Sequence, residues 1–181
     1  MKYSKTIQLK DGRECILRSA SAADAQGVLD NFILTHAQTD ELLSYPDEIT
    51  FTVEQEEKYL QAREESAYEV EVIAVVDGRV VGTAGVDLIS RAEKIRHRAS
   101  FGISIEQDYW GLGIGKALTL ACIECARQAG YVQLELEVVA DNAKAVALYK
   151  SVGFTEYGRN PKGFRSRLSG WQELIAMRME L

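Results

Sequence analysis

The segment from Arg98 to Val139 constrains the fold of this chain more than any other part of the sequence. Apolar and polar residues alternate through Arg98–Ile105 and again through Gln133–Val139, and a period of two is typical of β-strands. A glycine-rich loop and a predicted helix over about residues 115–129 connect them. A connection of this length joins neighbouring parallel strands, so the segment predicts one parallel pair with a helical crossover.

Two Asp-Gly pairs, at positions 11–12 and 77–78, each separate two strand-like segments and predict hairpins. Further predicted strands cover residues 6–9, 14–18, 69–76, 79–88, 154–157 and 172–180. Helices are expected over about 22–37, from the Thr52-Val53-Glu54-Gln55 capping box to about 65, and from Asp141 as the capping residue to about 151. The pattern predicts an α+β (α/β) fold with a mixed, mostly antiparallel central sheet of about seven strands.

Length and charge limit the functional classes. The 181 residues correspond to a single domain spanning residues 1–181, at roughly 150 residues per domain. The net charge of −6 argues against nucleic-acid binding. Residues 40–71 hold eleven acidic and two basic side chains, whereas residues 158–170 hold four basic and none acidic. These patches are either solvated surface or an acidic mouth for a cation and a basic patch for an anion.

Other features indicate a cytoplasmic protein without membrane contact. No apolar run approaches the ~20 residues that span a bilayer, and the first residues do not form the apolar core of a secretory signal. The three cysteines, Cys15, Cys122 and Cys125, are an odd number, so we expect no disulfide framework. The thiols of Cys122 and Cys125 fall on an apolar helical stripe and are predicted to fill the core, because a zinc site would need further ligands nearby.

The loop Tyr109–Lys116 is the first candidate for chemistry. Glycines at alternate positions allow a tight turn that points backbone N–H groups outward, and the following helix adds its positive N-terminal end. The loop therefore predicts a phosphate seat. It lacks the residues of a Walker loop, since Ala117 stands where Ser or Thr is required, and Lys116 stands where the dinucleotide fingerprint needs glycine. Glu135 lies downstream at a suitable distance, so a nucleotide-dependent oxidoreductase stays open as an alternative.

The second candidate is the run Asn142–Phe154, in which Asn142 and Tyr149 are seven residues apart and share a helix face. Together with the glycine loop it resembles the GNAT superfamily of acetyl-CoA-dependent N-acetyltransferases. The run is similar to that family's pattern NxxAxxLYxxxGF, and the loop to its pyrophosphate motif [QR]xxGx[GA], except that Trp110 replaces Gln or Arg. The resemblance covers about residues 70–157 and implies helices on both faces of the sheet.

The resemblance also implies roles for individual residues. Two strands would splay beside a bulge, freeing backbone groups of the first strand for the pantetheine arm and the thioester. Asn142 would touch the amide arm, and Tyr149 would protonate the leaving thiolate after direct attack by an amine. The remaining implied cofactor contacts are the backbone of Ile103, Ser104 and Ile105 for the arm, and the N–H groups of Gly111, Leu112, Gly113, Ile114, Gly115 and Lys116 for the pyrophosphate.

An ammonium ion must lose a proton before it can attack, so the reaction needs a base or a water relay. Glu106, at the end of the splayed strand, is the first candidate by position; Glu135, Glu137 and His97 are the others. The expected partner is a small-molecule or peptide amine, with a possible homodimer. The sequence leaves open which amine it is, and it also leaves open a catalytically inactive acyl-CoA-binding sensor or assembly module.

Overall fold

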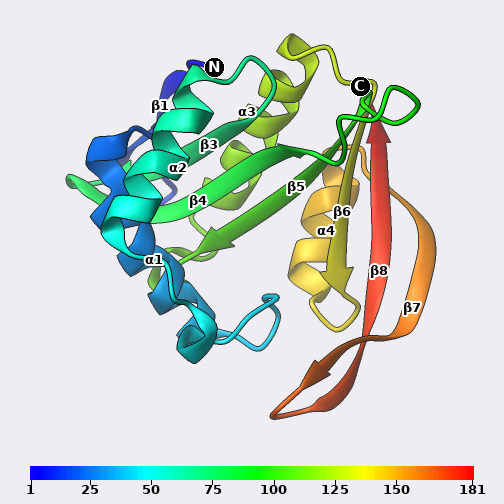
Figure 1. Ribbon diagram of the computed structural model, residues 1–181. Coiled ribbons are helices and arrows are strands. Elements are labelled where there is room, and N and C mark those ends of the chain that lie inside the picture. Colours follow the sequence, from blue (N-terminus) through cyan, green and yellow to red (C-terminus); the bar gives the residue numbers. More distant parts are fainter.

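The computed structural model describes residues 1–181 and arranges eight strands in one sheet, in the order β1-β2-β3-β4-β5-β6-β8-β7 (Figure 1). The β5–β6 pair is parallel and all other neighbouring pairs are antiparallel, as the crossover and the two Asp-Gly turns predict. The strands are β1 Ser4–Gln8, β2 Glu14–Ser19, β3 Val70–Val76, β4 Arg79–Leu88, β5 Arg98–Ile105, β6 Gln133–Val139, β7 Thr155–Ser166 and β8 Gly170–Glu180.

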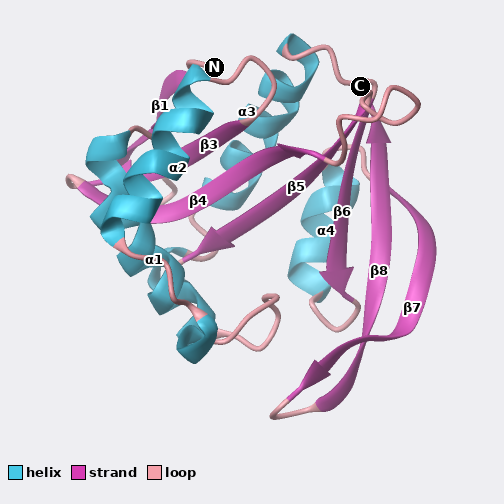
Figure 2. Cartoon of the chain, in the orientation of Figure 1, coloured by secondary structure: helices cyan, strands magenta, loops and turns pink.

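Helices cover both faces of this sheet (Figure 2). One face carries α1 and α2, and the other carries α3 and α4. The helices are α1 Ala25–Gln38, α2 Val53–Glu65, α3 Ile114–Gln128 and α4 Ala143–Ser151, with short 3₁₀ turns at Ala22–Asp24, Pro46–Glu48 and Gln107–Tyr109. No helix combines the length and the apolar character that crossing a bilayer requires.

The core is divided by the sheet into two unequal parts. The larger cluster holds 28 buried residues, many of them from the strands, α3 and α4, whereas the cluster beneath α1 and α2 holds six. The three cysteines are free, buried thiols, as expected for core fillers. The thinner packing under α1 and α2 leaves room for cavities on that face of the sheet.

The last strand pair differs from the prediction. β7 runs to Ser166 although its alternation ends near Tyr157, and its pairing with β8 is interrupted at Glu156/Gly158 and Asn160/Phe164. The irregular pairing explains the short predicted strand, because a bulge shifts side chains to the opposite face and breaks the period of two. The resulting long hairpin extends beyond the rest of the sheet (Figure 2).

Candidate active site

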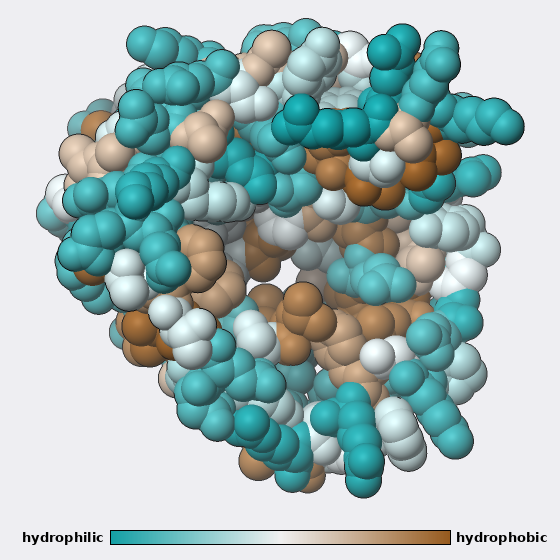
Figure 3. All heavy atoms as spheres, in the orientation of Figure 1, coloured by the Kyte–Doolittle hydropathy of each residue, from teal (hydrophilic) through white to brown (hydrophobic).

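A gap opens between β5 and β6, the only parallel pair. The two strands pair only from Arg98–Ser100 to Gln133–Glu135. Beyond this point β5 remains paired with β4 as far as Ile105, and β6 remains paired with β8 as far as Val139, but β5 and β6 no longer pair with each other. The strands therefore diverge in a wedge, and Figure 3 shows an opening through the molecule at this position, bordered by apolar residues.

The register of β5 determines which backbone groups border the gap. The N–H of Glu106 donates to the Val81 carbonyl at 3.0 Å, and antiparallel ladders alternate between bonded and non-bonded positions. Ile103 and Ile105 therefore direct their backbone groups away from β4 and into the gap. Ser104 directs its own backbone groups toward β4, so its backbone faces the β4 ladder and not the gap.

The glycine loop lies at the end of β5 and presents free donors. Gly111 and Gly113 adopt φ values of +78° and +103°, which favour glycine, and a Cβ built on either would meet no atom within 4 Å. None of the six backbone N–H groups from Gly111 to Lys116 has an acceptor within the protein. Consecutive free N–H groups at the N-terminus of α3 form an anion seat, and they fit the pyrophosphate of a coenzyme A derivative.

Neighbouring elements hold the loop in place. The indole N–H of Trp110 donates to the Ile105 carbonyl at 2.8 Å, which ties the loop to the strand that borders the gap. The Lys10 N–H in the β1–β2 turn donates to the Leu112 carbonyl at 3.2 Å. The Arg13 guanidinium lies 4.9 Å from the centre of the Tyr109 ring. Trp110, which departs from the family's Gln or Arg, thus has a structural role in this chain.

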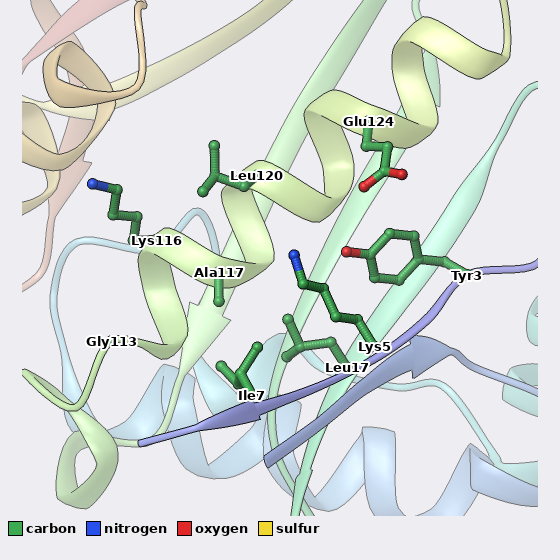
Figure 4. Close-up of a pocket in the computed structure, with 9 residues that line it drawn as sticks. All are labelled: Tyr3, Lys5, Ile7, Leu17, Gly113, Lys116, Ala117, Leu120 and Glu124. Atoms are coloured by element: carbon green, nitrogen blue, oxygen red, sulfur yellow. The ribbon is translucent and has the colours of Figure 1, made fainter. Parts of the chain in front are cut away.

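A shallow pocket continues from the loop along α3 toward β1 (Figure 4). Its volume is about 330 Å³, and Gly113, Lys116, Lys5 and Tyr3 are among the residues that line it. Figure 4 shows the Lys116 amino group on the loop side and Lys5 beneath α3. Lys116 adds positive charge at the loop end of α3, where a nucleotide phosphate would extend from the loop, whereas Lys5 lies farther along α3 and points toward Tyr3.

Tyr149 lies at the point where the gap begins. Its ring packs edge-on against Phe101, one residue beyond the last β5–β6 pair, and against Phe154. The residue is 7% exposed, and its hydroxyl has no partner in the protein yet is not sealed from solvent. Burial, assisted by the charge of Glu41, raises the Tyr149 pKa to about 12. The phenol therefore keeps its proton at neutral pH and remains available as a donor.

Asn142 begins α4 and contacts a residue that the sequence analysis did not consider. Its side-chain oxygen accepts from the Ala145 N–H at 3.0 Å, so Asn142 caps the helix. The sequence had suggested Asp141 as the capping residue, and that prediction was wrong. Its side-chain N–H donates to Glu41 at 2.5 Å. Glu41 lies 101 positions earlier in the loop after α1, so no local pattern links it to α4.

Glu106 occupies a crowded environment. It is 3% exposed, both of its oxygens accept from Arg79 at 2.6 and 2.7 Å, and one also accepts from Asn31 at 3.2 Å. Among the other candidate bases, Glu135 is paired with Arg98. His97 and Glu137 are exposed.

Hydrogen bonds and an ion pair join the loop after α1 to the β7–β8 hairpin. We define the loop–hairpin bridge as residues 40–47, after α1, together with residues 166–172 at the β7–β8 turn. Asp40 accepts from the hydroxyls of Ser166 at 2.6 Å and Ser169 at 3.0 Å. Arg167 donates to both carboxylate oxygens of Asp47 at 2.8 and 2.9 Å. The acidic and basic patches of the sequence therefore neutralise each other in part across this bridge.

Comparison with known proteins agrees with this architecture. Residues 34–154 match the Acetyltransferase (GNAT) family. The L-amino acid N-acetyltransferase AaaT of Escherichia coli (strain K12) is 34% identical over 93 residues, which are 51% of this chain and 57% of that protein. The chain spans about half the length of the first curated relatives it matches, 57% of one and 48% of another.

Solved structures share the fold over nearly the whole chain. An acetyltransferase of the GNAT family from Streptococcus pneumoniae superimposes with a TM-score of 0.87 at 25% identity, covering 92% of this chain and 99% of that one. The yncA protein of Salmonella typhimurium, solved with acetyl-CoA, has a TM-score of 0.79 at 20% identity, covering 91% and 92%. The family match over two thirds of the sequence, on a sheet with the expected gap and loop, shows that the chain belongs to the GNAT acetyltransferase family.

Proposed function

We propose that this chain is one acetyl-CoA-dependent N-acetyltransferase domain that acts in the cytoplasm on a primary amine of a small molecule or peptide. One observation carries the proposal. Six free backbone N–H groups lie at the end of a strand that borders an open gap, and the partnerless hydroxyl of Tyr149 lies where that gap begins. This arrangement suits a long acyl carrier held by its phosphates at one end and by its thioester at the other.

The residues of this chain would share the binding of acetyl-CoA. The N–H groups from Gly111 to Lys116 would hold the pyrophosphate. The backbone groups of Ile103 and the N–H of Ile105 would hydrogen-bond the pantetheine arm, since the Ile105 carbonyl already accepts from Trp110, and one of the two N–H groups would stabilise the charge that develops on the thioester oxygen. Asn142 would lie beside the amide arm, as the family pattern implies.

Acetyl-CoA supplies an activated acetyl group: the amine nitrogen bonds to the carbonyl carbon, and the carbon–sulfur bond breaks. Tyr149 would donate its phenolic proton to the departing sulfur. The raised pKa keeps that proton in place until the sulfur becomes basic. Burial against Phe101 and Phe154 fixes the ring, so the hydroxyl does not have to be ordered during the reaction.

Two carboxylates on the α1 side compete for the role of base. Glu106, the choice by position, already accepts three hydrogen bonds from Arg79 and Asn31. Glu41 accepts one from Asn142 and is close enough for its charge to act on Tyr149. We therefore infer that Glu41, directly or through water, is the stronger base candidate. Glu41→Gln should lower kcat/KM, while Glu106→Gln should mainly lower stability; the opposite pattern would return the role to Glu106.

An amine panel tests the function. Purified protein is mixed with acetyl-CoA and amino acids, polyamines and peptides, thiol release is followed, and products are identified by mass spectrometry. We expect acetylated product with at least one amine class. Acetyl-CoA binding without release across a wide panel would support the sensor instead. Light scattering on the same sample tests whether β7, at the open edge of the sheet, pairs with a second copy.

A further inference from the structure

A second cavity lies between α1 and α2, separate from the gap. Its volume is about 360 Å³, within the range of small-molecule sites. Glu71 on β3 and Thr83 on β4 line it at the sheet, and no residue of β5, β6, α3 or α4 takes part. The cavity therefore belongs neither to the glycine loop nor to the strands that border the gap.

Three aromatic side chains line this cavity: Phe32 from α1, Phe51 from the loop before α2, and Tyr59 from α2. The rings of Phe51 and Tyr59 are perpendicular, with centres 6.5 Å apart. Aromatic faces attract cations, and rings from different elements can surround a small cationic group on more than one side.

Three carboxylates line the same cavity, those of Glu48, Glu56 and Glu71. Glu56 is only 7% exposed, its side chain makes no hydrogen bond and no ion pair with any residue of the chain, and its oxygens are not sealed within the protein. A carboxylate that is largely removed from water and has no direct partner is stabilised by a cation placed beside it. Glu71 lies at the base of the same space and adds another acidic group.

The charge of Arg63 favours the ionised forms of Glu56 and Glu71, but Arg63 forms an ion pair with neither of them. Arg63 is ion-paired with Asp87, donates to the Val86 carbonyl at 3.1 Å, and stacks on Tyr59 with its guanidinium 4.6 Å from the ring centre. The guanidinium of Arg63 is therefore already engaged by Asp87, the Val86 carbonyl and the Tyr59 ring. Glu48 and Glu56, together with Glu71, whose pKa burial raises to about 7, make a cavity lined by aromatic rings acidic.

We propose that the cavity between α1 and α2 binds an organic cation, a quaternary or alkyl ammonium group small enough to lie between Phe51, Tyr59 and Glu56. A bare metal ion fits less well, because the structure contains no cluster of three or more His, Cys, Asp or Glu side chains that could hold one. The proposal goes beyond the acetyl transfer, because none of the elements proposed to bind acetyl-CoA lines this cavity. The cavity approaches them only through Thr83 on β4, the strand that pairs with β5.

Calorimetric titration with choline tests the charge requirement. Choline has no N–H to acetylate, so binding is measured independently of catalysis. Its neutral isostere 3,3-dimethylbutan-1-ol has the same shape without the charge. We expect choline to bind at least tenfold more tightly than the isostere. Equal affinities, or no choline binding, would overturn the proposal.

Variants locate the site. Glu56→Gln should weaken choline binding at least tenfold, and Phe51→Leu should weaken choline binding while leaving that of the isostere within twofold. Glu57→Gln, the exposed neighbour on the same helix, is the matched control and should change nothing. Saturating acetyl-CoA should leave the choline affinity unchanged, because the cavity shares no residue with the glycine loop or with β5 and β6. Loss of choline binding on adding acetyl-CoA, or equal effects of the two glutamate variants, would contradict this assignment.

Discussion

The hydroxyl of Tyr149 combines two properties that single-residue patterns do not reveal: a buried ring and a free, unpaired oxygen. The motif in the sequence located the residue, but a helical tyrosine with one apolar face would look the same in a purely structural role. What distinguishes it is Phe101, which places the ring where β5 and β6 part. Sequence reasoning could therefore identify this residue, whereas the packing that supports its role needed the structure.

Replacing Tyr149 with Phe should lower kcat by about 10²–10⁴-fold, the usual contribution of a positioned proton donor. The ring contacts are retained, so the KM for acetyl-CoA should stay within about twofold and the melting temperature should hardly change. Steady-state kinetics with the best amine of the panel measures both parameters. A kcat close to that of the wild type would remove Tyr149 from the acid role.

Glu71 makes the stability of the protein depend on pH. Burial raises the Glu71 pKa to about 7. The charge of Arg63 and a hydrogen bond from Thr83 lower this pKa, whereas the charges of Asp87 and Glu56 raise it. The unfolded value is about 4.3, so the folded state binds the proton more tightly. Its stabilising contribution is present at pH 4 and is lost as the pH rises through 7.

Glu71→Gln keeps this side chain neutral at all pH values. Relative to the wild type, its melting temperature should rise between pH 5 and pH 8 by several degrees, since each kcal/mol corresponds to about 2–4 °C in a chain of this size. Differential scanning calorimetry at both pH values measures this change. Glu57→Gln, on the exposed face of α2, serves as the control. A difference between variant and wild type that stays constant with pH would contradict the assigned shift.

At the scale of elements, the sequence predicted the bounds of strands best where one face of the strand is buried. The bounds of β5 and β6 agree with the alternating segments, and the capping box at Thr52 starts α2 as expected. The prediction was weaker for β7, where bulges break the period, and at the start of α4, where Asn142 caps instead of Asp141. Neighbouring polar residues compete for a cap, and local preference alone does not decide between them.

The glycine loop provides a test at this scale. Gly113→Val places a branched side chain at φ +103° among the free N–H groups, so acetyl-CoA binding should weaken at least 100-fold in calorimetry. Gly130→Val is the matched control: its φ is +80°, its Cβ direction is equally open, and it lies just beyond the other end of α3. Both variants should lower the stability of the protein, because each places valine at a positive φ, but only Gly113→Val should weaken acetyl-CoA binding. Equal affinities would exclude the loop as the phosphate seat.

At the scale of the whole molecule, the site depends on contacts between distant parts of the chain. The loop–hairpin bridge joins residues 126 positions apart, Asp40 and Ser166, and the link between Glu41 and Asn142 spans 101. No periodicity or motif predicts such pairs, because they depend on the path of the whole backbone. The uneven charge of the two segments was the only signal in the sequence, and it was interpreted as solvated surface or as ligand sites, not as a contact between the two segments.

Asp40→Ala removes the carboxylate that accepts hydrogen bonds from Ser166, Ser169 and the side chain of Gln172. The two segments of the loop–hairpin bridge should then be held together less tightly. We expect the KM for the amine to rise about fivefold or more while the KM for acetyl-CoA stays unchanged, together with faster amide hydrogen exchange in residues 40–47. Arg165→Ala, on the same hairpin with its guanidinium over Trp171, is the control. A change in the acetyl-CoA KM alone would contradict this role of the bridge.

The most direct measurement is a crystal structure of this protein with acetyl-CoA. The account predicts pyrophosphate oxygens within hydrogen-bond distance of the amides between Gly111 and Lys116, an acyl arm between β5 and β6, and the thioester sulfur beside the Tyr149 hydroxyl. A carrier bound elsewhere, or an arm that passes the gap with its sulfur far from that hydroxyl, would contradict it.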